Sequence, residues 1–71
     1  MLVAKIVVKN VTDYKIISKL AEYSYDDTVL VDIYDRCQAS VPSTLFTQCI
    51  GMLYSRNMKF DVIDYIDTTE D

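Results

Sequence analysis

The chain has 71 residues, of which 51% are hydrophobic and 25% are charged, with a net charge of −4 and no histidine. A chain of this length forms one small domain, which buries only about 60% of its unfolded surface. Because histidine is the usual general base and the commonest metal ligand, its absence argues against most acid–base and metal chemistry. The acidic balance argues against direct binding to nucleic acid.

The sequence also bears on location and on the cysteines. No apolar run approaches the roughly 18 residues of a membrane span, and residues 1–5 lack a charged leader before an apolar core. We therefore expect a cytoplasmic protein without membrane contact. Cys37 and Cys49 form no paired metal motif, so we expect free thiols that serve packing, with no metal and no cofactor.

The first half of the chain predicts two strands around a helix. Residues 2–9 alternate between apolar and mixed positions, which is typical of a strand with one apolar face. Residues 13–25 gather their apolar side chains on one side, which indicates a helix, with Asn10 or Thr12 as its N-cap. Residues 28–35 alternate again and predict the clearest strand.

The second half repeats the pattern. Residues 37–41 predict a short return strand, and residues 43–54 have apolar spacings of three, four and seven, which indicate a helix. We expect Pro42 just before this helix and Ser43 as its cap. Residues 58–66 predict the last strand. Its apolar set changes face near Val62 and Ile63, which indicates either a β-bulge or a strand that is apolar on both sides.

The order strand-helix-strand-strand-helix-strand predicts an α+β open-faced sandwich, with a three- or four-stranded sheet and two helices on one face. We expect a single domain over residues 1–66 and a frayed acidic tail over residues 67–71. The last strand should lie beside the first, inserted between it and the strand at 28–35. Lys5 and Lys9 would then face Asp61 or Asp64 as cross-strand pairs.

Three stretches resemble the HPr-like proteins, the phosphocarrier fold of the sugar phosphotransferase system. They are NVTDYKIISKLAEY at residues 10–23, the strand VLVDIY at 29–34, and the second helix region from Ser40 to Leu53 with CIGML at 49–53. The similarity spans residues 2–66. It implies the fold above and a regulatory serine at the start of the second helix, for which Ser43 is the nearest match and Ser40 the second.

The chain departs from that family at its active residues. An HPr-like carrier has a histidine followed by an arginine at the start of the first helix, where this chain has Thr12-Asp13-Tyr14. The family's last helix also has no counterpart in the sequence. We therefore expect no phosphohistidine carrier activity, and the resemblance leaves a regulatory or binding function open.

One face of the predicted sheet is the most informative feature for function. If both helices cover the other face, six apolar or aromatic residues remain on this one, and a surface of that kind typically binds a protein partner. These candidate interface residues are Val3, Val7, Leu30, Tyr34, Ile63 and Tyr65.

Three functional hypotheses follow. The leading one is a non-catalytic protein-binding module with an HPr-like fold, acting as a homodimer or docking on a larger protein through the open face. The second is a phosphorylation-regulated relative of HPr with Ser43 or Ser40 as the switch. The alternative is a small acidic inhibitor, phage-encoded in this interpretation, that occupies a basic nucleic-acid-binding groove of its target. An enzyme is not expected, because no nucleophile has a base partner.

Overall fold

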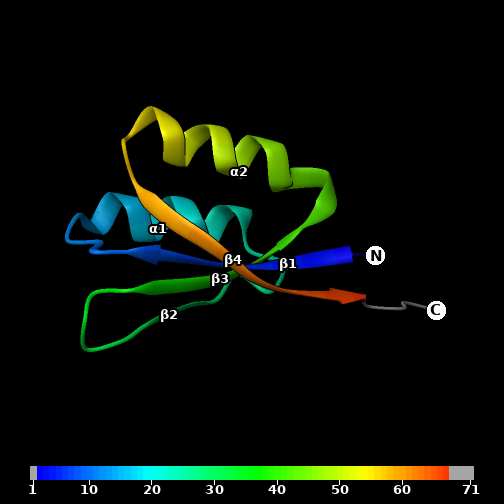
Figure 1. Ribbon diagram of the computed structural model, residues 1–71, viewed down its shortest axis with the longest axis horizontal. Coiled ribbons are helices and arrows are strands. Elements are labelled where there is room, and N and C mark those ends of the chain that lie inside the picture. Colours follow the sequence, from blue (N-terminus) through cyan, green and yellow to red (C-terminus); the bar gives the residue numbers. More distant parts are fainter. Residues whose placement is uncertain (1, 68–71) are drawn as a thin grey trace.

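The elements follow the predicted order. The computed structural model describes residues 2–67, shown in Figure 1. It contains six elements, which are β1 (Leu2–Lys9), α1 (Tyr14–Tyr23), β2 (Val29–Val31), β3 (Cys37–Pro42), α2 (Ser43–Ser55) and β4 (Lys59–Asp67). The prediction of an α+β chain with a four-stranded sheet and two helices is confirmed.

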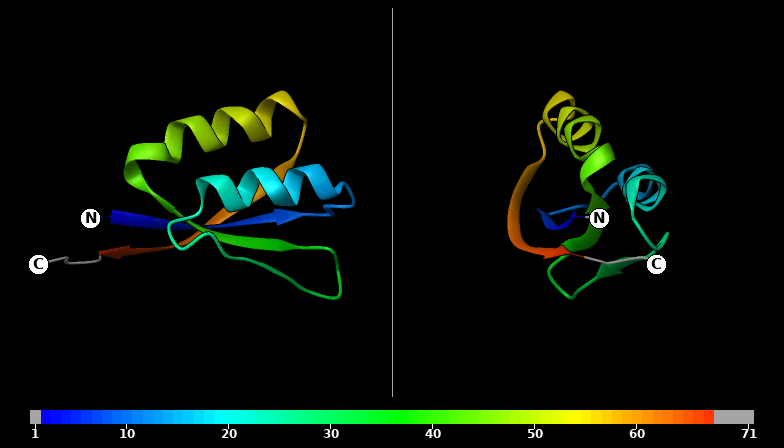
Figure 2. Two further views of the ribbon diagram at one scale, coloured as in Figure 1. Left: turned by 180° about the vertical axis from the view of Figure 1, so that it is seen from behind. Right: turned by 90° about the vertical axis from the view of Figure 1, so that its right-hand side faces the viewer.

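The four strands form one sheet in the order β2-β3-β1-β4, and every neighbouring pair is antiparallel. Both helices lie on the same side of this sheet, and no helix formed by residues 2–67 lies on the other side (Figure 2). The radius of gyration is 11.4 Å, close to the roughly 11 Å expected for a compact domain of this length. The open-faced arrangement is therefore as predicted.

The last strand lies beside the first as predicted, but it does not separate β1 from β2. That place belongs to β3, and β4 occupies the outer edge. The reason is local: β2 and β3 are joined by a short turn, so they pair as a hairpin, and the free edge of β3 is then available to β1. β1 and β2 remain parallel to each other without touching, as in a split β-α-β unit.

Alternation along β1 sets the two faces of the sheet. Ala4, Ile6 and Val8 point toward the helices and are buried, whereas Lys5 and Lys9 belong to the opposite row. The buried row packs against apolar residues from α1, α2 and β3, which complete the core: Ile16, Leu20, Cys37, Ala39, Val41, Cys49 and Leu53. A fully buried aliphatic side chain contributes about 1.5–3 kcal/mol, so this layer dominates the stability of the fold.

A β-bulge in β4 explains the change of face near Val62 and Ile63. Ile6 pairs with Val62 and Lys5 pairs with Asp64, so Ile63 is an extra residue on β4. Val62 packs on the core before the bulge. Tyr65 pairs with Ala4 beyond it, so its side chain lies on the helix side. The bulge is confirmed, and the assignment of Tyr65 to the open face is wrong.

Helix α1 begins at Tyr14, one residue later than predicted. Its N-cap is Asp13, whose carboxylate accepts a hydrogen bond from the Lys15 N–H at 2.9 Å. The predicted caps Asn10 and Thr12 do not serve, because Asn10 has a φ of 56° and turns the chain out of β1. The helix ends at Tyr23, two residues before the predicted end.

Helix α2 begins at Ser43 with Pro42 as its N-cap, and no side chain caps its first turn. The predicted capping role of Ser43 is therefore wrong, because this serine is already the first helical residue. The other end is closed by a Schellman motif with Asn57 at a φ of 56°. The N–H of Met58 bonds the Leu53 carbonyl at 3.0 Å, and that of Asn57 bonds the Tyr54 carbonyl at 3.1 Å.

The predicted tail falls partly inside the sheet. Asp67 is the last residue of β4 and pairs with Leu2, so β4 extends one residue beyond the predicted boundary at residue 66. The remainder of the predicted tail, residues 68–71, lies outside the described residues.

Gly51 offers a direct test of the account of α2. It lies exposed within the helix, and a Cβ added there would meet nothing within 4 Å. Because glycine is a poor helix former, Gly51→Ala should raise the free energy of unfolding by about 1 kcal/mol. Urea denaturation measures the change. Asn57→Ala should do the opposite, because alanine is strained at a positive φ. Equal effects of the two changes would contradict this description.

Cys49 gives a second test through its buried thiol. Burial raises the pKa of the Cys49 thiol from 9.0 to about 11. The native thiol therefore keeps its proton in a pH range where the unfolded thiol loses it, so stability should fall as pH rises through that range. The contribution lost is on the order of 2 kcal/mol. Denaturant titrations between those two pH values should show a shallower decline for Cys49→Ala than for the natural chain. Parallel declines would exclude this linkage.

Candidate protein-binding surface

The structure separates the six predicted interface residues. Val7, Leu30 and Ile63 do come together, since all three line one shallow hollow of about 470 Å³ on the open face. The other three do not contribute as predicted: Val3 is only 2% exposed, Tyr65 lies on the helix side, and Tyr34 lies in the turn between β2 and β3.

The predicted strand over residues 28–35 is mostly turn. β2 ends at Val31, and the carboxylate of Asp32 accepts hydrogen bonds from the N–H groups of Tyr34 at 2.8 Å and Arg36 at 3.2 Å. Asp35 has a φ of 57°, which completes the reversal. Aspartate bonds nearby backbone amides in this way and so competes with strand formation. The apolar alternation concealed this signal.

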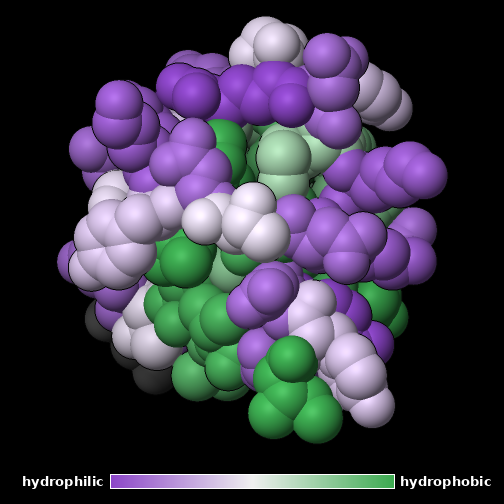
Figure 3. All heavy atoms as spheres, turned by 90° about the vertical axis from the view of Figure 1, so that its left-hand side faces the viewer, coloured by the Kyte–Doolittle hydropathy of each residue, from purple (hydrophilic) through white to green (hydrophobic). Residues whose placement is uncertain are grey.

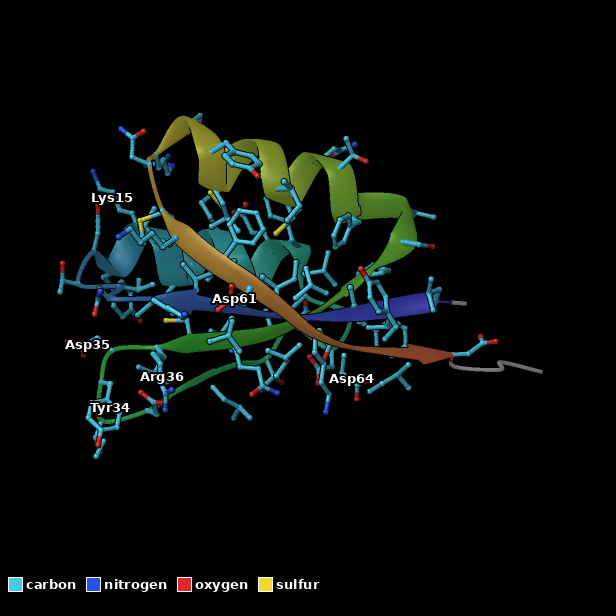
Figure 4. All side chains as sticks on the ribbon, viewed as in Figure 1. Lys15, Tyr34, Asp35, Arg36, Asp61 and Asp64 are labelled. Carbon is cyan, nitrogen blue, oxygen red and sulfur yellow. The ribbon has the colours of Figure 1, made fainter. Side chains whose placement is uncertain are left out.

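The same aspartate fixes the side chain of Arg36. Both Nη2 and Nε of Arg36 lie 2.6 Å from Asp32 Oδ2. The Arg36 side-chain hydrogen bond is the main cause that lowers the pKa of the Asp32 carboxyl below its ordinary value. The guanidinium carbon lies 5.1 Å from the centre of the Tyr34 ring, a cation–π contact that Figure 4 shows at the hairpin tip. Asp32 therefore bonds the backbone at Tyr34 and also places Arg36 against the Tyr34 ring.

Exposed apolar side chains gather around this turn. Ile33 is 88% exposed, Tyr34 65% and Leu30 63%, and Ile63 on β4 is 55% exposed. Figure 3 looks onto this end of the molecule, where hydrophobic residues lie together beside charged ones. We call the residues on and beside this turn the hairpin surface. They are Val7, Leu30, Val31, Ile33, Tyr34 and Ile63.

Sequence reasoning missed Ile33 and Val31 as members of this surface. The alternation placed both on the face opposite Leu30, and for Val31 the register agrees, since it pairs with the buried Cys37 although it also borders the hollow at the sheet edge. Ile33 is exposed because the chain leaves the strand at Asp32, and Val31 because β2 is an edge strand with no neighbour on its outer side. The two aspartates at positions 32 and 35 were the sequence signal that could have indicated the turn.

The charges of the open face largely compensate one another. Lys9 Nζ lies 2.7 Å from Asp61 Oδ2, and Lys5 pairs in register with Asp64, so the predicted cross-strand pairing is confirmed. Such exposed pairs contribute about 0–1 kcal/mol each and chiefly favour one register. Together with Asp32 and Arg36, they leave the hairpin surface bordered by charges of both signs.

The two candidate phosphorylation sites lie in different settings. Ser43 is exposed at the start of α2 and borders a smaller hollow of about 180 Å³ with Phe46 and Tyr65. Ser40 is half-buried within β3 opposite Lys5, and its carbonyl accepts the Tyr25 N–H. A kinase therefore reaches Ser43 more readily than Ser40 in the folded chain.

The remaining polar groups serve the fold. The Asp26 carboxylate lies 2.8 Å from the Ser24 hydroxyl and 3.1 Å from the Thr28 N–H, and the Ser24 contact is the main cause that lowers the pKa of Asp26.

Within residues 2–67, no group of three or more histidine, cysteine or acidic side chains could hold a metal ion. Neither helix in this part of the chain has the length and apolar character to cross a membrane.

Comparison with known proteins identifies no relative. The chain matches no protein-family model, no curated protein and no solved structure. The fold is therefore described by its own topology, and the function has to be inferred from the surface.

The turn built on Asp32 can be tested by amide hydrogen exchange. Asp32→Ala removes the acceptor for two backbone N–H groups, so exchange at Tyr34 and Arg36 should become faster. Asp61→Ala is the matched control, because it removes an exposed acid that does not bond the turn. The pKa of the Asp32 carboxyl is lowered in the folded protein, so the carboxylate should stop accepting these hydrogen bonds as pH falls through that lowered pKa. Exchange at the Tyr34 and Arg36 amides measures this loss as well. Unchanged exchange in Asp32→Ala would show that the carboxylate does not hold the turn.

Proposed function

We propose that this protein is a non-catalytic protein-binding module that engages its partner through the hairpin surface. The observation that carries the proposal is the exposure of Ile33 and Tyr34 on a turn held by Asp32. A large apolar side chain on a mobile loop loses freedom on binding, whereas one on a prebuilt turn loses less.

The composition of the surface supports the proposal. Tyrosine and arginine are enriched among the residues that contribute most to binding energy, and Tyr34 and Arg36 stand side by side here. Apolar area removed from water contributes about 25 cal/mol per Å². Leu30 and Ile63 add apolar area in the hollow, where Gln38 and the Lys9–Asp61 and Asp32–Arg36 pairs lie between and beside them, and protein interfaces commonly combine apolar and hydrogen-bonding groups in this way.

The chemistry of the described residues offers little support for an enzyme. Both cysteines are buried free thiols, and burial is the main cause that raises the pKa of each. Such thiols are poor nucleophiles. We accordingly propose a cytoplasmic binding protein without a cofactor.

A regulatory relative of HPr is the second candidate function, and the position of Ser43 favours it. A phosphate there would meet free N–H groups at the start of α2. The acidic inhibitor is less well supported, because Asp61 and Asp64 each lie opposite or beside a lysine. Carboxylates compensated in this way are poor mimics of a phosphate backbone.

Quantitative affinity capture from the native cell tests the leading proposal. The bait would be the natural chain, the double variant Ile33→Ser, Tyr34→Ser, and the control Tyr14→Ser, which removes an exposed tyrosine from α1. The double variant should lose its partner by at least about tenfold, as expected for central interface residues. The control should retain it. Equal recovery with all three baits would refute binding through the hairpin surface.

A further inference from the structure

We infer that the partner seated on the hairpin surface is a second copy of this chain, with Ile33 and Tyr34 of each copy entering the hollow of the other. The inference rests on the proposed function and names the partner. Three features carry it: the charge balance of the open face, the presence of both a projection and a hollow, and the protection of the two sheet edges.

The charge balance favours self-association over a strongly charged partner. The chain as a whole has a net charge of −4. By register and contact, the open face carries four basic side chains, Lys5, Lys9, Arg36 and Lys59, against three acidic ones, Asp32, Asp61 and Asp64. This face is therefore nearly neutral on an acidic molecule. Two copies repel elsewhere and meet here with the least electrostatic cost.

The shape of the surface is self-complementary. It carries a projection, the exposed Ile33 and Tyr34, and beside it a hollow in which Val7, Leu30 and Ile63 lie among Gln38 and the Lys9–Asp61 and Asp32–Arg36 pairs. In a two-fold dimer each contact occurs twice, so one surface that carries both parts satisfies itself. The hollow, at about 470 Å³, falls within the range of roughly 300–1,000 Å³ that accommodates small ligands, so it can receive such side chains.

The sheet edges are poor alternatives for the same association. The β4 edge carries Asp61, Asp64 and Asp67 and is interrupted by the bulge at Ile63. Acidic side chains and bulges are the usual means of preventing edge-to-edge pairing. The β2 edge is three residues long, which leaves few backbone groups to pair. A second copy is therefore expected on the face of the sheet, not along an edge.

Sedimentation equilibrium and mixed-label NMR of the full chain test the inference. The natural chain should show a mass of twice its 8.2 kDa. A mixture of isotope-labelled and unlabelled copies should give intermolecular signals between the Tyr34 ring and the methyl groups of Leu30 or Ile63. Tyr34→Ala should weaken association by at least about tenfold. Tyr14→Ala should leave it unchanged, and amide spectra of both variants verify folding. Added salt should strengthen the dimer, because it screens the net repulsion.

The outcomes separate this inference from the proposed function. A monomeric natural chain at millimolar concentration, or a dimer that Tyr34→Ala leaves intact, overturns the second copy as partner. If the chain is monomeric yet captures another protein in a manner that depends on Ile33 and Tyr34, the proposed function stands and only the identity of the partner is wrong. If substitution of Tyr34 changes neither self-association nor the capture of another protein, both the inference and the proposed function are wrong.

Discussion

Burial of Ile6 and Val8 beneath the two helices is the constraint on which the rest of the structure depends. β1 lies inside the sheet and pairs with β3 along one edge and β4 along the other. A slip of one residue in its register would exchange this buried row for the row that contains Lys5 and Lys9. A buried lysine without a partner is costly, so the alternation of β1 decides which face of the whole sheet is covered.

The register of β1 also determines which side chains lie on the uncovered face of the sheet. Among residues 2–67 no helix lies over this face, and Lys9 of β1 pairs there with Asp61 of β4. The apolar residues of this face concentrate toward the hairpin end, where Leu30 and Ile63 border the same hollow. Asp32 gives this end its shape, since its carboxylate organises the turn and holds Arg36 beside Tyr34.

A fold of this kind hosts many unrelated functions, so the functional proposal depends on surface chemistry. No family is identified for the chain, which the structure shows as a small α+β domain with a four-stranded antiparallel sheet and two helices. What distinguishes this molecule is an exposed aromatic and aliphatic tip on a turn organised by Asp32, with a hollow of mixed apolar and charged lining next to it. That combination is the basis of the proposed protein-binding function.

The sequence by itself determined the class and order of the elements, because period-two and helical patterns in β1, α1 and α2 are local consequences of which side chains face the core. It also indicated the pairing of lysines with aspartates across β1 and β4. It did not determine the strand order, since a linear pattern does not specify which free strand edge a later strand occupies. The structure decided the place of Tyr65 and Tyr34, because the sequence pattern left the bulge as one of two alternatives and continued the strand through Asp32. One extra residue at Ile63 reversed the face of the first, and the hydrogen bonds of Asp32 removed the second from the strand.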